Sequence, residues 1–518
     1  MHHDLTFEQS IGQHVMIGLS GTEVDDAFVD LVRTYKIGNV LLHRRNCEHK
    51  EQVRSLCSDI RQLIEQETGR EPLIAIAEEG GTVSVLSPDA THIPGAMAIS
   101  ATGDQGNAYT CGRIIAEELR ALGIQCNFAP NLAVNSNRMN PVAGIQSYSD
   151  NPETVADFAG STARGLSDGS VAAFCKFFPG HGDTITDEQT GLQVLDKMRE
   201  ELDACELLPF ASAVANAIAG VIVGHILVPA LETQPIVASL SGSIITELLR
   251  NEMGYDGIVC TDYLDSEPIQ RQYGVAHAAV EALKAGVDLI LLSENHDWVA
   301  EVVGAIAESH RNGYLSWEEH QRSQSRIATV KQRFSLRTTN PITVVGSEEH
   351  TGIARALMAR AVCAGNLPLE TLPELGDHPL FLGCIPDIPA QLSGGEAHAA
   401  LFPHWMANHI GGRSLITPTD PTNEEIIGLM EETKGTSSII IGTYNGYVQK
   451  GQLALANAMA GTGLITVVVA LGDPYDLVYL AENIHSFATF EYSPLAFEAI
   501  RCILTHERSA TGVLPIHW

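Results

Sequence analysis

Apolar residues fall along the first 335 residues in short, continuous runs, separated by longer stretches with helical periodicity. Continuous runs are typical of strands that are buried on both faces of a parallel sheet. Strands and helices that alternate over this length predict an α/β fold, a (β/α)8 TIM-type barrel, with a doubly wound open sheet as the second possibility. The predicted strands are Gly38–Leu42, Leu73–Ala77, Gln125–Phe128, Val171–Lys176, Gly220–His225, Gly257–Thr261 and Asp288–Leu292.

Polar residues repeatedly follow the ends of these runs. Because the loops at the carboxyl ends of barrel strands converge on one pocket, this recurrence predicts a functional site there, although each residue alone is equally suited to cap a helix or to lie in a loop. The residues are His43, Arg44, Glu78, Glu79, Asn131, Lys176, His225, Asp262 and Glu294.

The segment 335–348, SLRTTNPITVVGSE, is rich in polar and turn-forming residues and follows a helical pattern that ends near Phe334. We therefore expect a barrel domain over residues 1–335, a linker over 336–348 and a second domain over 349–518. The second domain has three β-rich apolar runs, Pro379–Cys384, Ser437–Gly442 and Gly463–Leu471, with helical segments between them. This pattern predicts a smaller three-layer αβα sandwich.

The composition narrows the class of partner. The chain has 31 basic and 63 acidic residues in 518, a formal charge of -32, which disfavours binding to nucleic acid or to an anionic membrane surface. No apolar run reaches the ~18 residues of a membrane span, and the N-terminus does not resemble a secretory signal. Ten cysteines without CxxC pairs favour reduced core thiols. We therefore expect a cytoplasmic protein.

The segment 174–189, FCKFFPGHGDTITDEQ, is the strongest candidate for chemistry. Lys176 emerges at the end of a buried strand, and a glycine-punctuated loop with several proton-carrying side chains follows it. His181 and Asp183 in this loop could be taken for a metal pair, but two ligands without a third are weak evidence. No metal and no cofactor is expected.

Several segments together resemble glycoside hydrolase family 3, in its β-N-acetylhexosaminidase-like branch. GNVLLHRRN is similar to the family's GGVILFRRN, AEEGGTVSVL to DQEGGRVQRL, and FAPNLAVNSNRMNPVAGIQSYSDNPE to FAPVLDVNSNPNNPVIGVRSFGEDPE. CKFFPGHGDTITDEQ resembles AKHFPGHGDTxxDSH, VGHILVPALE resembles TAHIxYPALD, and GIVCTDYLDSEPI resembles GVIVTDALDMKAI. The closing segment of the chain is similar to the tail of two-domain members.

The resemblance implies a retaining, metal-free glycosidase that acts on a β-linked sugar in a small molecule or an oligosaccharide. It places the catalytic nucleophile on Asp262, after a buried strand, although an N-cap at this position is a plain alternative. In this branch the proton donor is an Asp-x-His pair, which falls on Asp187 and Gln189 here. A glutamine amide cannot deliver a proton at neutral pH, so the usual acid/base is missing.

Other positions depart from the family pattern as well. Phe177 stands where the family has a sugar-binding histidine after the lysine, and Thr82 and Gln146 stand where the family has arginines. Ala77 stands where the DQEGG motif has its first acidic residue, so Glu78 is the nearest substitute. We expect Glu78, Gln146, Lys176, Phe177, His181, Asp183 and His225 to line the substrate site. Glu188, Asp183, His181 and His43 remain open as substitute proton donors.

Two functions follow from this pattern. The first is a glycosidase with an atypical acid/base, which still cleaves substrates with good leaving groups. The second is a non-hydrolytic family member, either a sugar-binding pseudoenzyme or a catalyst recruited to other chemistry on a small molecule. Phe177, Tyr148 and Tyr263 favour the second by making the pocket more apolar, although aromatic side chains also serve as platforms for a pyranose ring.

Overall fold

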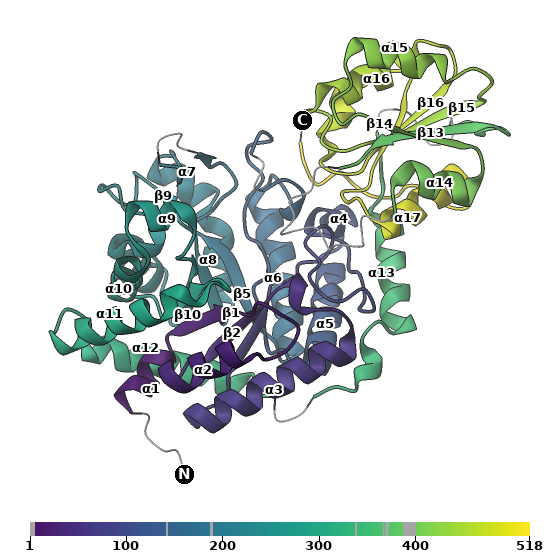
Figure 1. Ribbon diagram of the computed structural model, residues 1–518. Coiled ribbons are helices and arrows are strands. Elements are labelled where there is room, and N and C mark those ends of the chain that lie inside the picture. Colours follow the sequence, from purple (N-terminus) through teal and green to yellow (C-terminus); the bar gives the residue numbers. More distant parts are fainter. Residues whose placement is uncertain are drawn as a thin grey trace.

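The computed structural model of the protein describes residues 6–140, 143–186, 190–336, 339–365, 367, 372–386 and 400–517. Its first part is a closed barrel of eight parallel strands in the order β1-β11-β10-β8-β5-β4-β3-β2 (Figure 1). The predicted (β/α)8 barrel is therefore confirmed. The strands are β1 (Val15–Gly18), β2 (Asn39–Leu42), β3 (Leu73–Ile76), β4 (Cys126–Asn127), β5 (Ala172–Phe178), β8 (Gly220–Val223), β10 (Ile258–Tyr263) and β11 (Leu289–Leu292).

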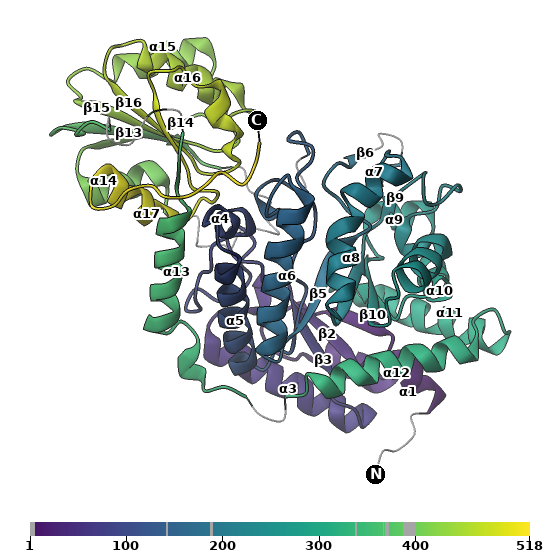
Figure 2. The same ribbon diagram turned by 180° about the vertical axis from the view of Figure 1, so that it is seen from behind.

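Helices surround the barrel on its outer face (Figures 1 and 2). Several begin at a polar side chain that accepts a backbone N–H of the first turn, as Asp25 does before α2 and Asn151 before α6. The helical segments are α1 (Phe7–Gly12), α2 (Asp26–Tyr35), α3 (Lys50–Thr68), α4 (Ala96–Ala101), α5 (Gln105–Leu122), α6 (Pro152–Asp168), α7 (Arg199–Ala204), α8 (Leu207–Ala215), the π-helical η4 (Ser243–Glu252), α9 (Glu267–Gln272), α10 (Val275–Ala285), α11 (Val299–Arg311) and α12 (Trp317–Arg333).

The barrel differs from the sequence prediction in two places. The first strand, β1, was not predicted, because a buried run of four residues directly after a short helix carries no periodicity that marks it as a strand. A small sheet of β6 (Ile185–Thr186), β7 (Gln193–Val194) and β9 (Ile226–Leu227) was also not predicted. It joins the loop after β5 to the loop after β8.

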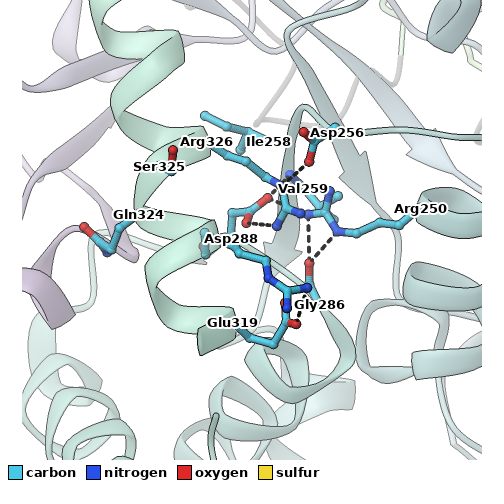
Figure 3. Close-up of polar contacts among 12 residues, drawn as sticks. Arg250, Asp256, Ile258, Val259, Gly286, Asp288, Glu319, Gln324, Ser325 and Arg326 are labelled. Carbon is cyan, nitrogen blue, oxygen red and sulfur yellow. Dashed lines mark hydrogen bonds and ion pairs between the residues drawn. The ribbon is translucent and has the colours of Figure 1, made fainter. Parts of the chain in front are cut away.

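Ion pairs tie the amino-terminal end of the barrel together (Figure 3). The fully buried carboxylate of Asp288, which precedes β11, accepts hydrogen bonds from Arg250 Nη2 at 2.6 Å and from the backbone N–H of Val259 at 2.8 Å. Arg326 on α12 lies 3.5 Å from its other oxygen. The network therefore joins η4, β10, β11 and α12. On the interior side, α12 and the following Phe334 pack against the barrel core.

The second part contains a six-stranded sheet in the order β12-β17-β16-β15-β13-β14, parallel except for the β12/β17 pair. Helices α14 and α17 cover one face and α15 and α16 cover the other, so the expected three layers are present (Figure 1). The elements are α13 (Glu348–Ala361), β12 (Cys363–Ala364), β13 (Pro379–Cys384), α14 (Phe402–Ile410), β14 (Arg413–Thr417), α15 (Asn423–Glu431), β15 (Ser438–Thr443), α16 (Lys450–Ala460), β16 (Ile465–Ala470), β17 (His485–Ala488) and α17 (Pro494–Leu504). Three of the strands, β12, β14 and β17, were not predicted.

The segment between the two sheets contains a short turn at Ile342–Val344 before α13 begins, and residues 337 and 338 lie outside the described residues. Helix α13 runs alongside α4 and α5 (Figures 1 and 2). Its His350 binds Glu118 of α5 at 2.8 Å. The boundaries at 335 and 348 remain predictions.

The second part docks on the loop that follows β3. Its Glu491, whose side chain is fully buried, lies 3.2 Å from His92 Nε2 and accepts the backbone N–H of Gly95 at 3.2 Å. Met97, Ala98 and Ala101 of α4 belong to the apolar core of the second part. The β3 loop is therefore shaped by both parts of the chain.

Candidate functional site

Asp262 lies at the carboxyl end of β10, where the strand shifts register against β11 between Cys260 and Tyr263. Such a shift re-aims the side chains that follow it. The half-buried carboxylate of Asp262 accepts the backbone N–H of Tyr263 through Oδ1 at 2.9 Å, and Oδ2 has no hydrogen-bond partner among the described residues. One oxygen is thus fixed and the other is available.

Lys176 on β5, which β8 separates from β10, forms a buried ion pair with Glu79. The Nζ–Oε1 distance is 2.6 Å, and each side chain is 9% exposed. The ammonium group also lies 5.2 Å from the centre of the Phe177 ring, which packs against the barrel core. Lys176 and Phe177, both predicted site residues, therefore lie side by side at the end of β5.

Glu78 occupies a different position from Glu79. Its buried carboxylate accepts the backbone N–H groups of Gly80, Val85 and Leu86 at 2.8 to 3.1 Å, within its own loop. Burial raises the pKa of Glu78, and these hydrogen bonds oppose the rise. The predicted contact of Glu78 with substrate stays a prediction. Glu79 was among the polar residues that follow the predicted strands, but it was not selected as a residue of the substrate site.

The PGHG loop after β5 is held by local contacts. The His181 ring bonds Thr184 Oγ1 through Nδ1 at 2.8 Å, and its carbonyl accepts the Asn140 side chain at 2.7 Å. A Cβ on Gly182 would lie 1.6 Å from the Val134 carbonyl oxygen, so only glycine fits there. Burial lowers the pKa of His181, and the negative charge of Asp262 opposes this.

The loop's acidic residue Asp183 is paired with Lys197 at 3.1 Å. Lys197 in turn binds the buried Glu206 at 2.6 Å. These contacts anchor the loop to the segment before α8. The predicted catalytic residues Asp187 and Gln189, and the alternative donor Glu188, lie outside the described residues.

His225 follows β8, and both of its ring nitrogens have partners. Nδ1 lies 2.7 Å from Ser239 Oγ and Nε2 lies 2.9 Å from the Tyr263 carbonyl oxygen. Burial lowers the pKa of His225, and the charge of Asp262 again opposes the shift. His225 therefore supports the backbone beside Asp262, and a direct contact with substrate remains a prediction.

His43, which follows β2, contacts the other side of Tyr263. Its Nε2 lies 3.2 Å from the Tyr263 hydroxyl, and the rings stack with centres 6.0 Å apart. Burial and the nearby Arg45 lower the pKa of His43. Arg45 is itself paired with Glu294 after β11. The ends of β2, β10 and β11 are thus joined, as the recurrence of polar residues at strand ends predicted.

Gln146 lies in the turn Gly144–Gln146 and lines a small hollow with Glu79, Thr82 and Phe490. The buried hydroxyl of Thr82 has no hydrogen-bond partner among the described residues. Phe490 belongs to the second part of the chain, so both parts line this hollow. Two positions where the resemblance expects arginine, Thr82 and Gln146, therefore lie together.

Within the described ranges, no group of three or more histidine, cysteine, aspartate or glutamate side chains is arranged to hold a metal ion. No helix in the same ranges is long and apolar enough to cross a membrane. All ten cysteines are free, and most are buried.

Comparison with known proteins gives matches over the whole chain. Residues 6–330 match the glycosyl hydrolase family 3 N-terminal domain. Beta-hexosaminidase A of Pseudoalteromonas piscicida is 32% identical over 413 residues, which cover 71% of this chain and 69% of that protein. A β-hexosaminidase of Alkalilimnicola ehrlichii is 31% identical over 56% of this chain and 83% of its own length.

The solved structure of a family 3 β-N-acetylglucosaminidase from Paenibacillus superposes with a TM-score of 0.91 at 32% identity and covers 99% of both chains. The β-glucoside phosphorylase BglX has a TM-score of 0.84 at 17% identity, which indicates the shared fold. The family match, the aligned relatives and the barrel with its second sheet agree with one another. The chain belongs to glycosyl hydrolase family 3.

Proposed function

We propose that the protein is a retaining glycosidase for β-linked sugars of the N-acetylhexosamine class, with Asp262 as its nucleophile. In the first step an Asp262 oxygen attacks the anomeric carbon, and the bond from that carbon to the leaving oxygen breaks. In the second step water attacks the glycosyl-Asp262 ester, loses a proton to a base and releases the sugar. The substrate class comes from the names of the relatives.

The position of Asp262 carries this proposal. A nucleophilic carboxylate needs a fixed orientation and one oxygen free to attack. Asp262 combines an oxygen held by the Tyr263 N–H with one that has no partner among the described residues. Had both oxygens been bound to backbone N–H groups, a capping role would be favoured instead.

The Lys176 and Glu79 pair supports the binding of a sugar. An ammonium group donates to hydroxyl oxygens and a carboxylate accepts from hydroxyl hydrogens, so the pair can hold two neighbouring hydroxyl groups. Because both side chains are largely shielded from water, such contacts are screened less and are stronger.

Among the open alternatives for the proton donor, His181 has the best support. Asp183 is paired with Lys197, and His43 bonds the Tyr263 hydroxyl. His181 uses Nδ1 for Thr184, while its Nε2 has no partner in the part of the chain that the structure describes. Because its pKa is lowered, His181 is suited to accept the proton of water in the second step. In the first step, leaving groups of low pKa need little protonation.

The test uses 2,4-dinitrophenyl β-N-acetylglucosaminide, whose leaving group needs no protonation. We expect turnover by the wild type, loss of at least about a thousandfold in Asp262→Ala, and a covalent sugar adduct on Asp262 in the intact mass. Asp297→Ala, which removes an exposed carboxylate after the neighbouring strand β11, serves as the control. Equal rates for the wild type and Asp262→Ala would refute the proposal.

A non-hydrolytic role is the second candidate, and the packing of Phe177 and Tyr263 against the barrel core favours it because both rings make the mouth more apolar. The double variant Gln189→His with Phe177→His distinguishes the two. The glycosidase proposal predicts that the variant gains activity on aryl N-acetylglucosaminides with poor leaving groups. A folded but inert variant supports the non-hydrolytic candidate.

A further inference from the structure

A cleft of about 1310 Å³ lies at the amino-terminal end of the barrel, away from the mouth. It is bounded by α3, α12 and residues that precede β1 and β3. Gln13 precedes β1, and Arg70 and Glu71 precede β3. The mechanism proposed above uses none of these residues.

Lys331 of α12 forms the floor of this cleft and is 7% exposed. Its Nζ donates to Gln13 Oε1 at 2.8 Å and to the Gly38 carbonyl oxygen at 3.0 Å, and no carboxylate oxygen of the described residues lies within 4 Å. Both partners are neutral. Burial lowers the pKa of Lys331 to about 7; the charge of Arg70 adds to this and that of Glu71 opposes it. An anionic ligand would stabilise the protonated form of an amine that has only neutral partners.

Two guanidinium groups line the walls of the same cleft. Arg61 on α3 has a buried Nε without a hydrogen-bond partner, and within the described ranges neither Arg61 nor Arg70 forms an ion pair. The buried Nε2 of Gln13 is likewise without a partner there. In a chain with 63 acidic and 31 basic residues, three cations without a carboxylate partner around one cleft are unexpected.

Among the described residues, the carboxylates of the cleft form no ion pair with these cations. Glu71 accepts hydrogen bonds from Ser335 Oγ at 2.7 Å and from the backbone N–H of Leu336 at 2.8 Å. Glu65 lies on the exposed side of α3; burial together with the charge of Glu71 raises its pKa, and the charge of Arg61 opposes the rise. The guanidinium donors of Arg61 and Arg70 and the third N–H of protonated Lys331 therefore remain available.

We propose that this cleft binds a doubly charged oxyanion, a phosphate group above all, through Arg61, Arg70 and Lys331. Guanidinium groups bind phosphate oxygens in pairs, and a lysine adds a point charge. The volume exceeds that of a phosphate ion, so the cleft also accommodates a small organic body attached to it. The shared chemistry is the phosphate group, whether free or carried by a metabolite.

The first test titrates the full-length protein with sodium sulfate by calorimetry at constant ionic strength, with chloride as the compensating ion. Sulfate keeps its two charges across the pH range used, so a pH effect reports the protein. We expect saturable binding that weakens about fivefold or more from pH 6 to pH 8, as Lys331 loses its proton. The charged groups that face Lys331 are Arg70 and Glu71, with Arg61 and Glu65 further along the cleft.

Variants then locate the site. Arg61→Gln and Arg70→Gln, both at half-buried positions, should each weaken sulfate binding about tenfold or more, since a charged hydrogen bond is lost. Lys331→Met should abolish the pH effect. Arg54→Gln removes the same charge from an exposed position on the same helix and should leave binding unchanged. Because Lys331 is buried, the two arginine variants decide the outcome if Lys331→Met does not fold.

Inorganic phosphate and a hexose 6-phosphate distinguish the two sources of the ligand. Tighter binding of the hexose phosphate identifies a phosphorylated metabolite, and equal binding identifies free phosphate. The proposal is overturned if no anion binds saturably, or if Arg54→Gln weakens binding as much as Arg70→Gln. Neither result depends on glycosidase activity, so this test is independent of the proposed function.

Discussion

Replacement of Asp288 by asparagine removes one negative charge from the amino-terminal end of the barrel at almost constant side-chain volume. The N–H of Val259 and Nη2 of Arg250 both bind Oδ2, so the asparagine oxygen still accepts from both at that position, but the negative charge is lost and the new NH2 group faces Arg326. The Arg250 side chain is only 10% exposed, so its charge would be left without a carboxylate partner in a poorly solvated position.

The expected loss follows from the burial of this pair. Breaking a buried pair by removal of one partner costs about 3 to 5 kcal/mol. Arg250 keeps the carbonyl oxygens of Tyr255, Gly257 and Gly286 as acceptors, which favours the lower end of that range. A loss of about 3 kcal/mol lowers the folded-to-unfolded ratio roughly a hundredfold.

Urea unfolding followed by tryptophan fluorescence measures this loss. The control is Glu432→Gln in the Arg413–Glu432 pair, which has a similar distance of 2.8 Å but side chains that are 52% exposed, so a change of about 0 to 1 kcal/mol is expected. Glycosidase activity under folding conditions should be unchanged in both variants, because Asp288 lies at the end opposite the mouth. The reasoning is refuted if Asp288→Asn matches the control.

Three further predictions concern ionisable groups. The Glu491 carboxylate raises the pKa of His92 against the effect of burial, so the stabilisation that His92 provides is full below its ordinary pKa and is lost as pH rises through the raised value. His92→Gln should therefore lower the melting temperature more at about pH 5.5 than at about pH 8.5. Burial raises the pKa of Asp473 from 3.8 to about 7, so its stabilising contribution is full below pH 3.8 and is lost through about pH 7. Asp473→Asn should stabilise the protein at about pH 8, by at most about 4 kcal/mol, and this gain should vanish toward pH 4. His181→Ala should slow the second catalytic step about a hundredfold or more, so that a glycosyl-enzyme accumulates and azide restores turnover.

Each of these has a contradicting result. An equal effect of His92→Gln at both pH values would show that the histidine charge plays no part in docking the second domain. A loss of stability in Asp473→Asn at pH 8 would show that the carboxylate is ionised and bound there. Unchanged turnover in His181→Ala would assign the proton transfer to another residue.

The barrel could be predicted from the sequence because its strands are buried on both faces and give continuous apolar runs. Strand β1 was missed because its run follows almost directly on the short helix α1, and β14 because its residues are only partly buried and include the exposed Arg413. The small sheet of β6, β7 and β9 has two-residue strands, which leave no pattern. Burial, length and separation from the preceding element therefore decided which strands could be recognised.

The candidate site was predictable to a similar degree. Strand ends located Asp262, Lys176 and His225 correctly at one end of the barrel, since the geometry of a parallel barrel fixes that end. The sequence could not distinguish Glu78 from Glu79, because neighbouring side chains leave a loop in directions that only the folded backbone defines. The partners of His225 come from residues 14 and 38 positions away, and only folding brings them together.

The buried contact of Glu491 with the β3 loop has a consequence for protein engineering. A shortened version that ends before α13 would leave His92 and the Gly95 N–H without their acceptor, and the segment that carries Glu79 would lose its outer support. Anyone who wishes to use the barrel by itself must therefore redesign that segment first, for example by building a carboxylate from within the barrel to take the place of the missing one.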